Sequence, residues 1–186
     1  MSHEQLVGWC NFHDIYAEAA AEARDDSVLV EVGVAFGRSL AFLAKSLLDA
    51  GKKSTLYGVD PWPRDARSWT SDGSVARPDG AFLSFCRGMV QHAPHELERI
   101  SILRLSSLDA AKAVGALGGA DFVFIDANHA YEHVRADIAA WRPVVRRGGV
   151  LAGHDHCDYT PGVEKAVREV FGSDYVVRGS SWWKRL

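Results

Sequence analysis

The sequence has few of the features that mark a secreted, membrane or nucleic-acid-binding protein. Its 186 residues include only three cysteines, an odd number without CxxC spacing, so we expect reduced thiols rather than a disulfide framework. No apolar run approaches the ~20 residues that cross a bilayer, and the first residues lack the basic and apolar stretches of a signal peptide. The net charge of −3 is unlike that of a nucleic-acid binder. We therefore expect a cytoplasmic protein with neither a nucleic-acid nor a membrane partner.

The composition is that of a globular domain. Hydrophobic residues make up 47% and charged residues 24% of the chain, which argues against disorder or low complexity. No internal repeat is present. At about 150 residues per domain, the length predicts one domain over residues 1–186.

Short apolar runs alternate with segments of helical period. We expect strands at 28–32, 55–59, 100–105, 121–125 and 149–152, helices at 12–24, 38–50, 81–92, 108–117, 131–141 and 162–171, and a final strand pair at 174–178 and 181–184. Such alternation requires right-handed crossovers and a mainly parallel sheet covered on both faces. Residues 1–27 form an N-terminal helical segment. Residues 62–80 are polar and too long for an ordinary connection, which predicts either a lid over the sheet or a surface excursion.

A glycine-containing turn follows the first predicted strand. Three residues separate Gly33 from Gly37, which differs from the GxGxxG pattern that cradles a dinucleotide pyrophosphate. Glu31 at the strand end would repel a pyrophosphate but can accept hydrogen bonds from a cationic amine. Asp60 ends the second strand, where an acidic side chain binds ribose hydroxyls in nucleoside-binding α/β folds. An ordinary turn at Gly33 and a turn aspartate before Pro61 remain the alternatives.

Four motifs together carry a family resemblance. They are Glu31-x-Gly33-x3-Gly37-x-Ser39, Gly58-Val59-Asp60-x-Trp62, Phe124-Ile125-Asp126-x2-His129 and Gly148-Gly149-Val150. In this order the chain resembles class I S-adenosylmethionine-dependent methyltransferases, over about residues 28–170. It is most similar to small-molecule O-methyltransferases whose fourth strand ends in Ile-Asp-x-x-His or Ile-Asp-x-x-Lys. The resemblance implies a Rossmann-like, mainly parallel seven-stranded sheet with an antiparallel C-terminal strand.

The resemblance also implies which residues bind S-adenosylmethionine. Gly33 and Gly37 would line the methionine moiety, and Asp60 would hold the ribose. The remaining residues that we expect near the cofactor are Glu31, Phe36, Ser39, Ser106, Ser107 and Asp126. Ser106 and Ser107 stand by the adenine, where relatives carry an acidic residue.

A divalent cation and a base complete the site that the resemblance implies. In the metal-dependent relatives an aspartate after the fourth strand and an acidic pair after the fifth bind the cation, and here Asp126, Asp155 and His156 hold those positions. Carboxylates suit Mg²⁺, whereas imidazole favours Mn²⁺, Fe²⁺, Co²⁺, Ni²⁺ or Zn²⁺. His129 occupies the position of the residue that deprotonates the acceptor hydroxyl, and an imidazole is suited to that role near neutral pH.

The leading hypothesis is therefore methyl transfer to a hydroxyl of a small molecule such as a phenol, catechol or sugar. The pocket would be covered by the lid or completed by a second subunit in a homodimer. Two alternatives stay open: a nicotinamide- or nucleotide-binding oxidoreductase, which the Gly33-x3-Gly37 spacing disfavours, and a cofactor-binding domain without turnover.

Overall fold

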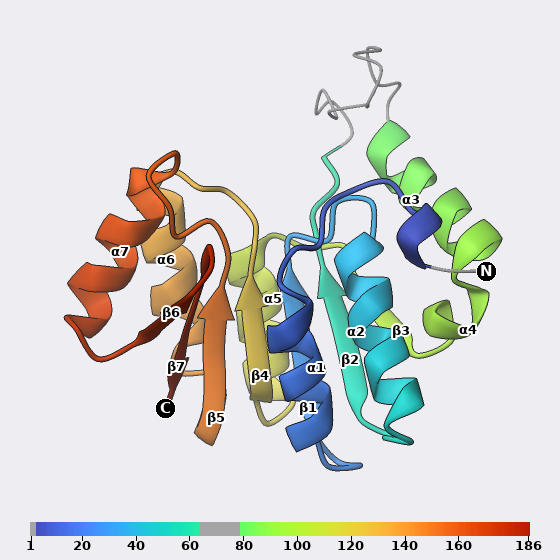
Figure 1. Cartoon of the computed structure of the whole chain (residues 1–186), viewed down its shortest axis with the longest axis horizontal. Helices are drawn as coiled ribbons and strands as arrows, with labels where there is room; N and C mark the ends of the chain where they lie inside the picture. Colours follow the sequence, from blue (N-terminus) through green and yellow to red (C-terminus); the bar gives the residue numbers. More distant parts are fainter. Residues whose placement is uncertain (1–2, 64–78) are drawn as a thin grey trace.

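The computed structural model describes residues 3–63 and 79–186, and its centre is one twisted sheet (Figure 1). The described strands are β1 (Val28–Val32), β2 (Thr55–Val59), β3 (Ile100–Leu103), β4 (Ala120–Ile125), β5 (Val145–Gly153), β6 (Val176–Arg178) and β7 (Ser181–Arg185). They lie in the order β3-β2-β1-β4-β5-β7-β6. β1 to β5 are parallel, and β7 pairs antiparallel with both β5 and β6. The predicted seven-stranded, mainly parallel fold is confirmed.

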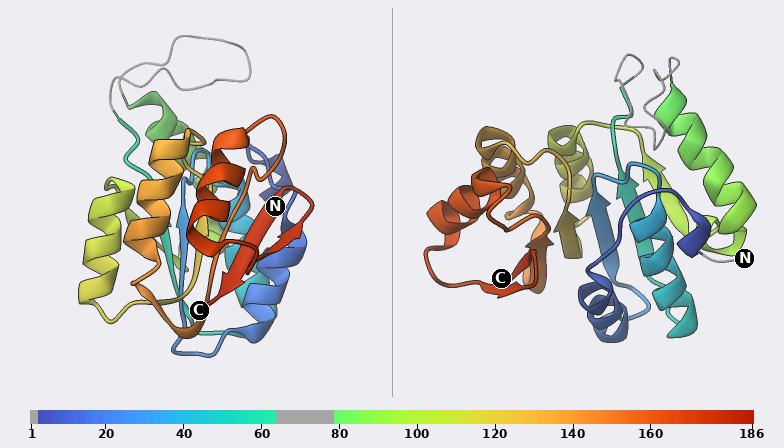
Figure 2. Two further views of the ribbon diagram at one scale, coloured as in Figure 1. Left: turned by 90° about the vertical axis from the view of Figure 1, so that its left-hand side faces the viewer. Right: turned by 45° about the horizontal axis from the view of Figure 1, so that its top comes forward.

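Helices cover both faces of the sheet (Figure 2). α1 (His13–Glu22), α2 (Arg38–Asp49) and α3 (Gly80–His92) pack on one face, and α5 (Ser107–Ala116), α6 (Tyr131–Trp141) and α7 (Pro161–Phe171) pack on the other. Each has an apolar face at helical spacing; on α2, Leu40, Leu43 and Leu47 are buried against the sheet. Two short helical turns, η1 (His3–Gln5) and α4 (Pro94–Leu97), were not predicted. No helix in the described ranges is long and apolar enough to span a membrane.

The strand order reverses between β1 and β4, and ligands bind at such a point in open parallel sheets, in the region that we call the crevice. The chain leaves β1 toward α2 on one face and leaves β4 toward α6 on the other, so the two connections diverge above the strand ends. Gly33 follows β1 with φ +97°, and a Cβ atom there would lie 2.0 Å from the carbonyl oxygen of Asp126. Only glycine fits this position, because the two connections touch backbone to backbone.

One expectation for the region after β2 needs correction. Trp62, which we assigned to the lid, is only 2% exposed and packs against Phe82 and Phe85, with ring centroids 5.1 and 5.0 Å away. Its indole Nε1–H donates to the carbonyl oxygen of Ala35 at 2.8 Å. Trp62 is therefore part of the core that supports the turn after β1. Residues 64–78 of the predicted lid lie outside the described residues, and Gly80 already begins α3.

Candidate active site

The ends of β1 and β2 form the first half of the candidate site. Asp60 follows β2, and both of its carboxylate oxygens accept backbone N–H groups, from Ala35 at 3.0 Å and from Trp62 at 2.8 Å. Partial burial raises the pKa of Asp60, and these N–H groups counteract that rise. The carboxylate is thus held in one orientation beside the turn after β1, while each oxygen keeps a lone pair for a ligand hydroxyl.

Glu31 lies beneath this turn and is 1% exposed. It accepts hydrogen bonds from the hydroxyls of Tyr16 on α1 and Ser39 on α2, both at 2.7 Å. Burial raises the pKa of Glu31 to about 8, against the effect of the two hydroxyl donors, and the nearby carboxylates of Asp126 and Asp60 raise it further. Glu31 therefore joins β1 to α1 through Tyr16 and to α2 through Ser39. Tyr16 was not predicted, because the sequence shows only that it faces the core.

The start of α2 borders the crevice next to Glu31. Gly37 has φ +89°, and a Cβ atom there would lie 2.8 Å from ring carbons of Phe85. Phe36 beside it is half-buried. No side chain caps this end of α2, so backbone N–H groups of its first turn have no side-chain partner and can bind a ligand.

The two serines predicted near the adenine already have partners within the fold. Ser106 caps α5 by accepting the N–H of Asp109 at 3.2 Å and donates to the Asp109 carboxylate at 2.7 Å. Ser107 Oγ accepts the indole N–H of Trp141 at 2.9 Å. Both follow β3, which is the neighbour of the strand that carries Asp60. Their position suits the predicted role, which remains a prediction.

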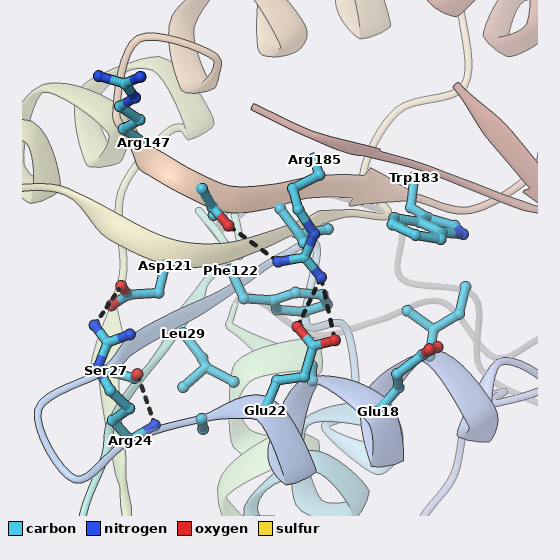
Figure 3. Close-up of a pocket in the computed structure, with 16 residues that line it drawn as sticks. Glu18, Glu22, Arg24, Ser27, Leu29, Asp121, Phe122, Arg147, Trp183 and Arg185 are labelled. Atoms are coloured by element: carbon cyan, nitrogen blue, oxygen red, sulfur yellow. Dashed lines mark hydrogen bonds and ion pairs between the residues drawn. The ribbon is translucent and has the colours of Figure 1, made fainter. Parts of the chain in front are cut away.

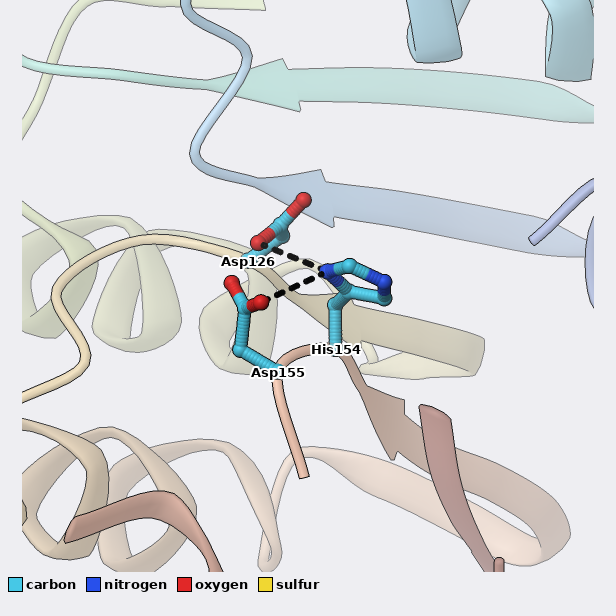
Figure 4. Close-up of side chains that lie close together, drawn as sticks. All are labelled: Asp126, His154 and Asp155. Carbon is cyan, nitrogen blue, oxygen red and sulfur yellow. Dashed lines mark ion pairs between the residues drawn. The ribbon is translucent and has the colours of Figure 1, made fainter. Parts of the chain in front are cut away.

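The ends of β4 and β5 form the second half of the site. Asp126 follows β4, and His154 and Asp155 follow β5; the two strands pair in register up to Ile125 and Gly153. One ligand atom from each of the three side chains lies within 4.8 Å of the others (Figure 4). His154 Nδ1 is 3.8 Å from Asp126 Oδ1 and 3.4 Å from Asp155 Oδ1. Two carboxylate oxygens and an imidazole nitrogen therefore converge on one point.

The predicted third ligand, His156, does not lie in this cluster. Its Nε2 atom is 3.0 Å from the hydroxyl of Tyr175, just before β6, and His154 takes the place instead. Asp155 has φ +57°, a turn of the backbone that separates the two histidines. In the sequence His154-Asp155-His156 either imidazole could point toward Asp126 and Asp155. The sequence alone therefore does not show which histidine joins the two carboxylates.

His129, in the connection between β4 and α6, bonds to the same carboxylates. Its Nε2 atom lies 2.9 Å from Asp155 Oδ2 and 3.7 Å from Asp126 Oδ1. The hydrogen bonds to Asp126 and Asp155 raise the pKa of His129 to about 10, and the bond from His129 lowers the pKa of Asp155. In this arrangement the imidazole is protonated at neutral pH, so it cannot accept a proton while both carboxylates face it.

The segment that links η1 to α1 also lies against this edge, which the sequence did not indicate (Figure 1). The Phe12 ring packs 4.8 Å from the ring of His154 and 4.6 Å from that of Phe124. Burial, with a smaller contribution from Glu31, raises the pKa of the Cys10 thiol to about 12. This segment therefore forms a wall of the candidate site.

A cavity of about 270 Å³ lies at the opposite edge of the sheet (Figure 3). It is bordered by α1 and by the starts of β4 and β5, with Leu29, Phe122 and Trp183 among its lining residues, and Arg185 reaches across it to Glu22 at 2.8 Å. It lies at the amino ends of the parallel strands, whereas the candidate site residues lie at their carboxyl ends.

Comparisons with known proteins agree on the fold. Residues 30–156 match the protein-family model described as "Methyltransferase domain". Among solved structures, CalS11, a TDP-rhamnose 3'-O-methyltransferase of calicheamicin biosynthesis, is 19% identical with a TM-score of 0.66, over 93% of this chain and 76% of CalS11. TomG from Streptomyces achromogenes, an O-methyltransferase of tomaymycin synthesis solved with SAM, is 16% identical with a TM-score of 0.63, over 97% of this chain and 82% of TomG.

A larger neighbour was solved with a metal. MycE of the mycinamycin biosynthetic pathway, in complex with Mg, SAH and mycinamycin VI, is 16% identical with a TM-score of 0.60, over 96% of this chain and 51% of MycE. No curated protein matches the sequence.

Proposed function

The chain belongs to the methyltransferase-domain family, and from this premise we propose that it transfers a methyl group from S-adenosylmethionine to a hydroxyl of a small molecule. One observation carries the proposal. An oriented aspartate beside a glycine turn, suited to a nucleoside, lies at the same sheet edge as a cluster of carboxylates and imidazoles, suited to activating a hydroxyl. A methyl donor and an acceptor bound in these two halves would meet above β1 and β4.

The acceptor class that we favour is a sugar or another hydroxylated small molecule. CalS11 acts on a TDP-rhamnose hydroxyl, and MycE was solved with mycinamycin VI. The net charge of −3 gives no support for a polyanionic acceptor such as a nucleic acid.

On the cofactor side, we assign the ribose hydroxyls to Asp60 and the methionine moiety to the turn from Gly33 to Gly37. The N–H groups that hold the Asp60 carboxylate counteract the rise of its pKa and fix its orientation beside the turn, where it could accept a pair of hydroxyls. Glu31 supports this turn from below, and the cationic amine of the methionine moiety would favour its charged form on binding. Ser106 and Ser107 would stand near the adenine.

On the acceptor side, Asp126, His154 and Asp155 fit a divalent cation. The fit rests on their donor set, because two carboxylate oxygens and one imidazole nitrogen lie within 4.8 Å of one another. When bound, such a cation supplies a positive charge that lowers the pKa of a hydroxyl beside it. The nitrogen donor favours Mn²⁺, Fe²⁺, Co²⁺, Ni²⁺ or Zn²⁺ over Mg²⁺.

We assign the general base to His129. Its protonated state depends on the free carboxylates of Asp126 and Asp155. A cation held by these carboxylates would stop them stabilising the imidazolium and would lower the pKa of His129. The neutral imidazole would then be able to accept the proton of the acceptor hydroxyl.

Two measurements test this function. Calorimetric titration with S-adenosylhomocysteine and with NADH separates it from a nicotinamide-dependent activity: we expect binding of the first and none of the second. Mass spectrometry then follows methyl transfer to a panel of sugar nucleotides, glycosides, phenols and catechols. Binding of S-adenosylhomocysteine without transfer to any acceptor, with and without added cations, would support a non-catalytic domain instead.

A further inference from the structure

The turn between β6 and β7 contacts the cluster from the side opposite to the carboxylates. Ser180 Oγ lies 2.8 Å from His154 Nε2, while the other ring nitrogen, Nδ1, faces Asp126 and Asp155. The backbone of the same residue is also engaged, because its carbonyl oxygen accepts the N–H of His156 at 2.8 Å. Ser180 therefore contacts the segment after β5 through both its side chain and its main chain.

This contact is compatible with a proton on either ring nitrogen of His154, because a serine hydroxyl can accept from Nε2–H or donate to a bare Nε2. A neutral imidazole has one N–H group and one lone pair. Nδ1 is 3.4 Å from the nearer carboxylate oxygen, which is long for a hydrogen bond, whereas the contact of Nε2 with the serine hydroxyl has an ordinary hydrogen-bond length. A cation bound at Nδ1 would need the lone pair on that nitrogen, so the proton would lie on Nε2, 2.8 Å from the Ser180 hydroxyl oxygen that can accept it.

With that proton position, Asp126, Asp155 and His154 present only electron pairs to one another, and the protonated His129 beside Asp155 supplies the positive charge that a bound cation would replace. Two carboxylate oxygens and the Nδ1 lone pair would face one another within 4.8 Å, an arrangement that a cation stabilises and that repels any anion. In metal sites the second nitrogen of a ligating histidine is commonly hydrogen-bonded in this way, which sets the orientation and basicity of the ring.

The serine is held in place by the elements around it. Arg178, two residues before it, pairs with Asp14 at 3.3 Å and Glu18 at 2.8 Å on α1, and the strands on both sides of the turn are paired through Arg178 and Ser181. The imidazole of His154 is 11% exposed and packs against Phe12. Neither partner of the hydrogen bond is a loose surface group.

We propose that Ser180 is a positioning residue for the cation site: it accepts the Nε2–H of His154 and thereby directs the Nδ1 lone pair at the ion. The inference rests on the proposed function, since it concerns the cation of that site. It further implies that Ser180 contributes most to the affinity for Co²⁺, less to that for Mn²⁺ and least to that for Mg²⁺, in the order in which these cations bind nitrogen.

The test compares Ser180→Ala with the conservative Ser180→Thr in the full-length protein. Calorimetric titration with Co²⁺, Mn²⁺ and Mg²⁺ measures affinity, the visible spectrum of bound Co²⁺ reports nitrogen coordination, and ¹⁵N chemical shifts of His154 report the protonated nitrogen. For Ser180→Ala we expect Co²⁺ and Mn²⁺ affinity to fall about 10- to 100-fold, with unchanged S-adenosylhomocysteine binding. Ser180→Thr should retain wild-type affinity, because it keeps the hydroxyl.

Two results would overturn the inference: equal Co²⁺ affinity in the wild type and Ser180→Ala, or a cation-loaded wild type in which His154 is protonated on Nδ1. Failure of the proposed function is distinguishable. In that case the wild type itself binds neither S-adenosylhomocysteine nor a cation, whatever stands at position 180.

Discussion

The Nε2 atom of His129 lies 2.9 Å from Oδ2 of Asp155, so one carboxylate serves both the candidate base and the candidate cation site. In the ion-free arrangement this contact and that with Asp126 keep His129 protonated, with its pKa near 10. A base role at neutral pH therefore requires that the carboxylates bind something else. The candidate base and the candidate cation site are therefore coupled through Asp155, so that a change in one should alter the other.

Removing the imidazole tests the base directly. We expect His129→Gln to lower kcat by about 100-fold or more, with unchanged affinity for S-adenosylhomocysteine, because His129 is on the acceptor side of the crevice. His133→Gln, at an exposed position on α6, is the matched control and should retain activity. Equal losses of turnover and of cofactor affinity in His129→Gln would indicate a structural role instead.

The same residue predicts how the stability of the ion-free protein depends on pH. Because folding raises the pKa of His129, its stabilising effect is complete below about pH 6.5 and is lost toward about pH 10. The imidazole is 42% exposed, so solvent screening limits the effect to about 1 kcal/mol. Urea unfolding in EDTA across this range should show a decline that His129→Gln lacks. A parallel decline in both proteins contradicts the assignment.

Glu31 predicts a second pH dependence, at lower pH. Burial raises its folded pKa from 4.5 to about 8, so its proton stabilises the fold fully below about pH 4.5, and that stability is lost as the pH rises to about 8. Glu31→Gln, which carries no titrating group, should remove this part of the pH slope and weaken S-adenosylhomocysteine binding. Glu132→Gln, at an exposed position on α6, should change neither quantity.

Two glycines with positive φ allow the cost of backbone strain to be distinguished from the cost of a steric clash. Gly33 and Gly51 have φ +97° and +66°, but a Cβ atom at Gly33 would meet the Asp126 carbonyl, whereas one at Gly51 would meet nothing within 4 Å. Gly51→Ala should cost about 1 kcal/mol of unfolding free energy from strain alone. Gly33→Ala should cost more and abolish S-adenosylhomocysteine binding. Similar costs in both variants, with binding intact, would contradict the proposed contact between the two connections.

Much of the fold could be predicted because its central strands are short, mostly buried apolar runs. The predicted strands at 28–32 and 55–59 coincide with β1 and β2, since each run is bounded by polar or glycine residues. The aspartates after β2, β4 and β5 could be located for the same reason: strand ends in a parallel sheet meet at one edge.

Details of the site depended on contacts between distant segments. His154, and not His156, lies with Asp126 and Asp155, and a residue of positive φ stands between the two histidines. The bond from Tyr16 to Glu31 joins residues on separate elements. Trp62 looked like lid material because its neighbours in sequence are polar, but its partners Phe82 and Phe85 come from α3. Neither backbone angles nor such pairings can be deduced from periodicity.

The central claim is cation-assisted methyl transfer through the carboxylates of the cluster, and one assay tests it most directly. Mass spectrometry would quantify methylated product from the wild type, Asp155→Asn and the control Asp158→Asn, which lies at an exposed position nearby, each with added Mn²⁺ or with EDTA. We predict product from the wild type and Asp158→Asn with Mn²⁺, and a loss of about 100-fold or more with EDTA or in Asp155→Asn. Equal product from all three proteins under both conditions would contradict the account.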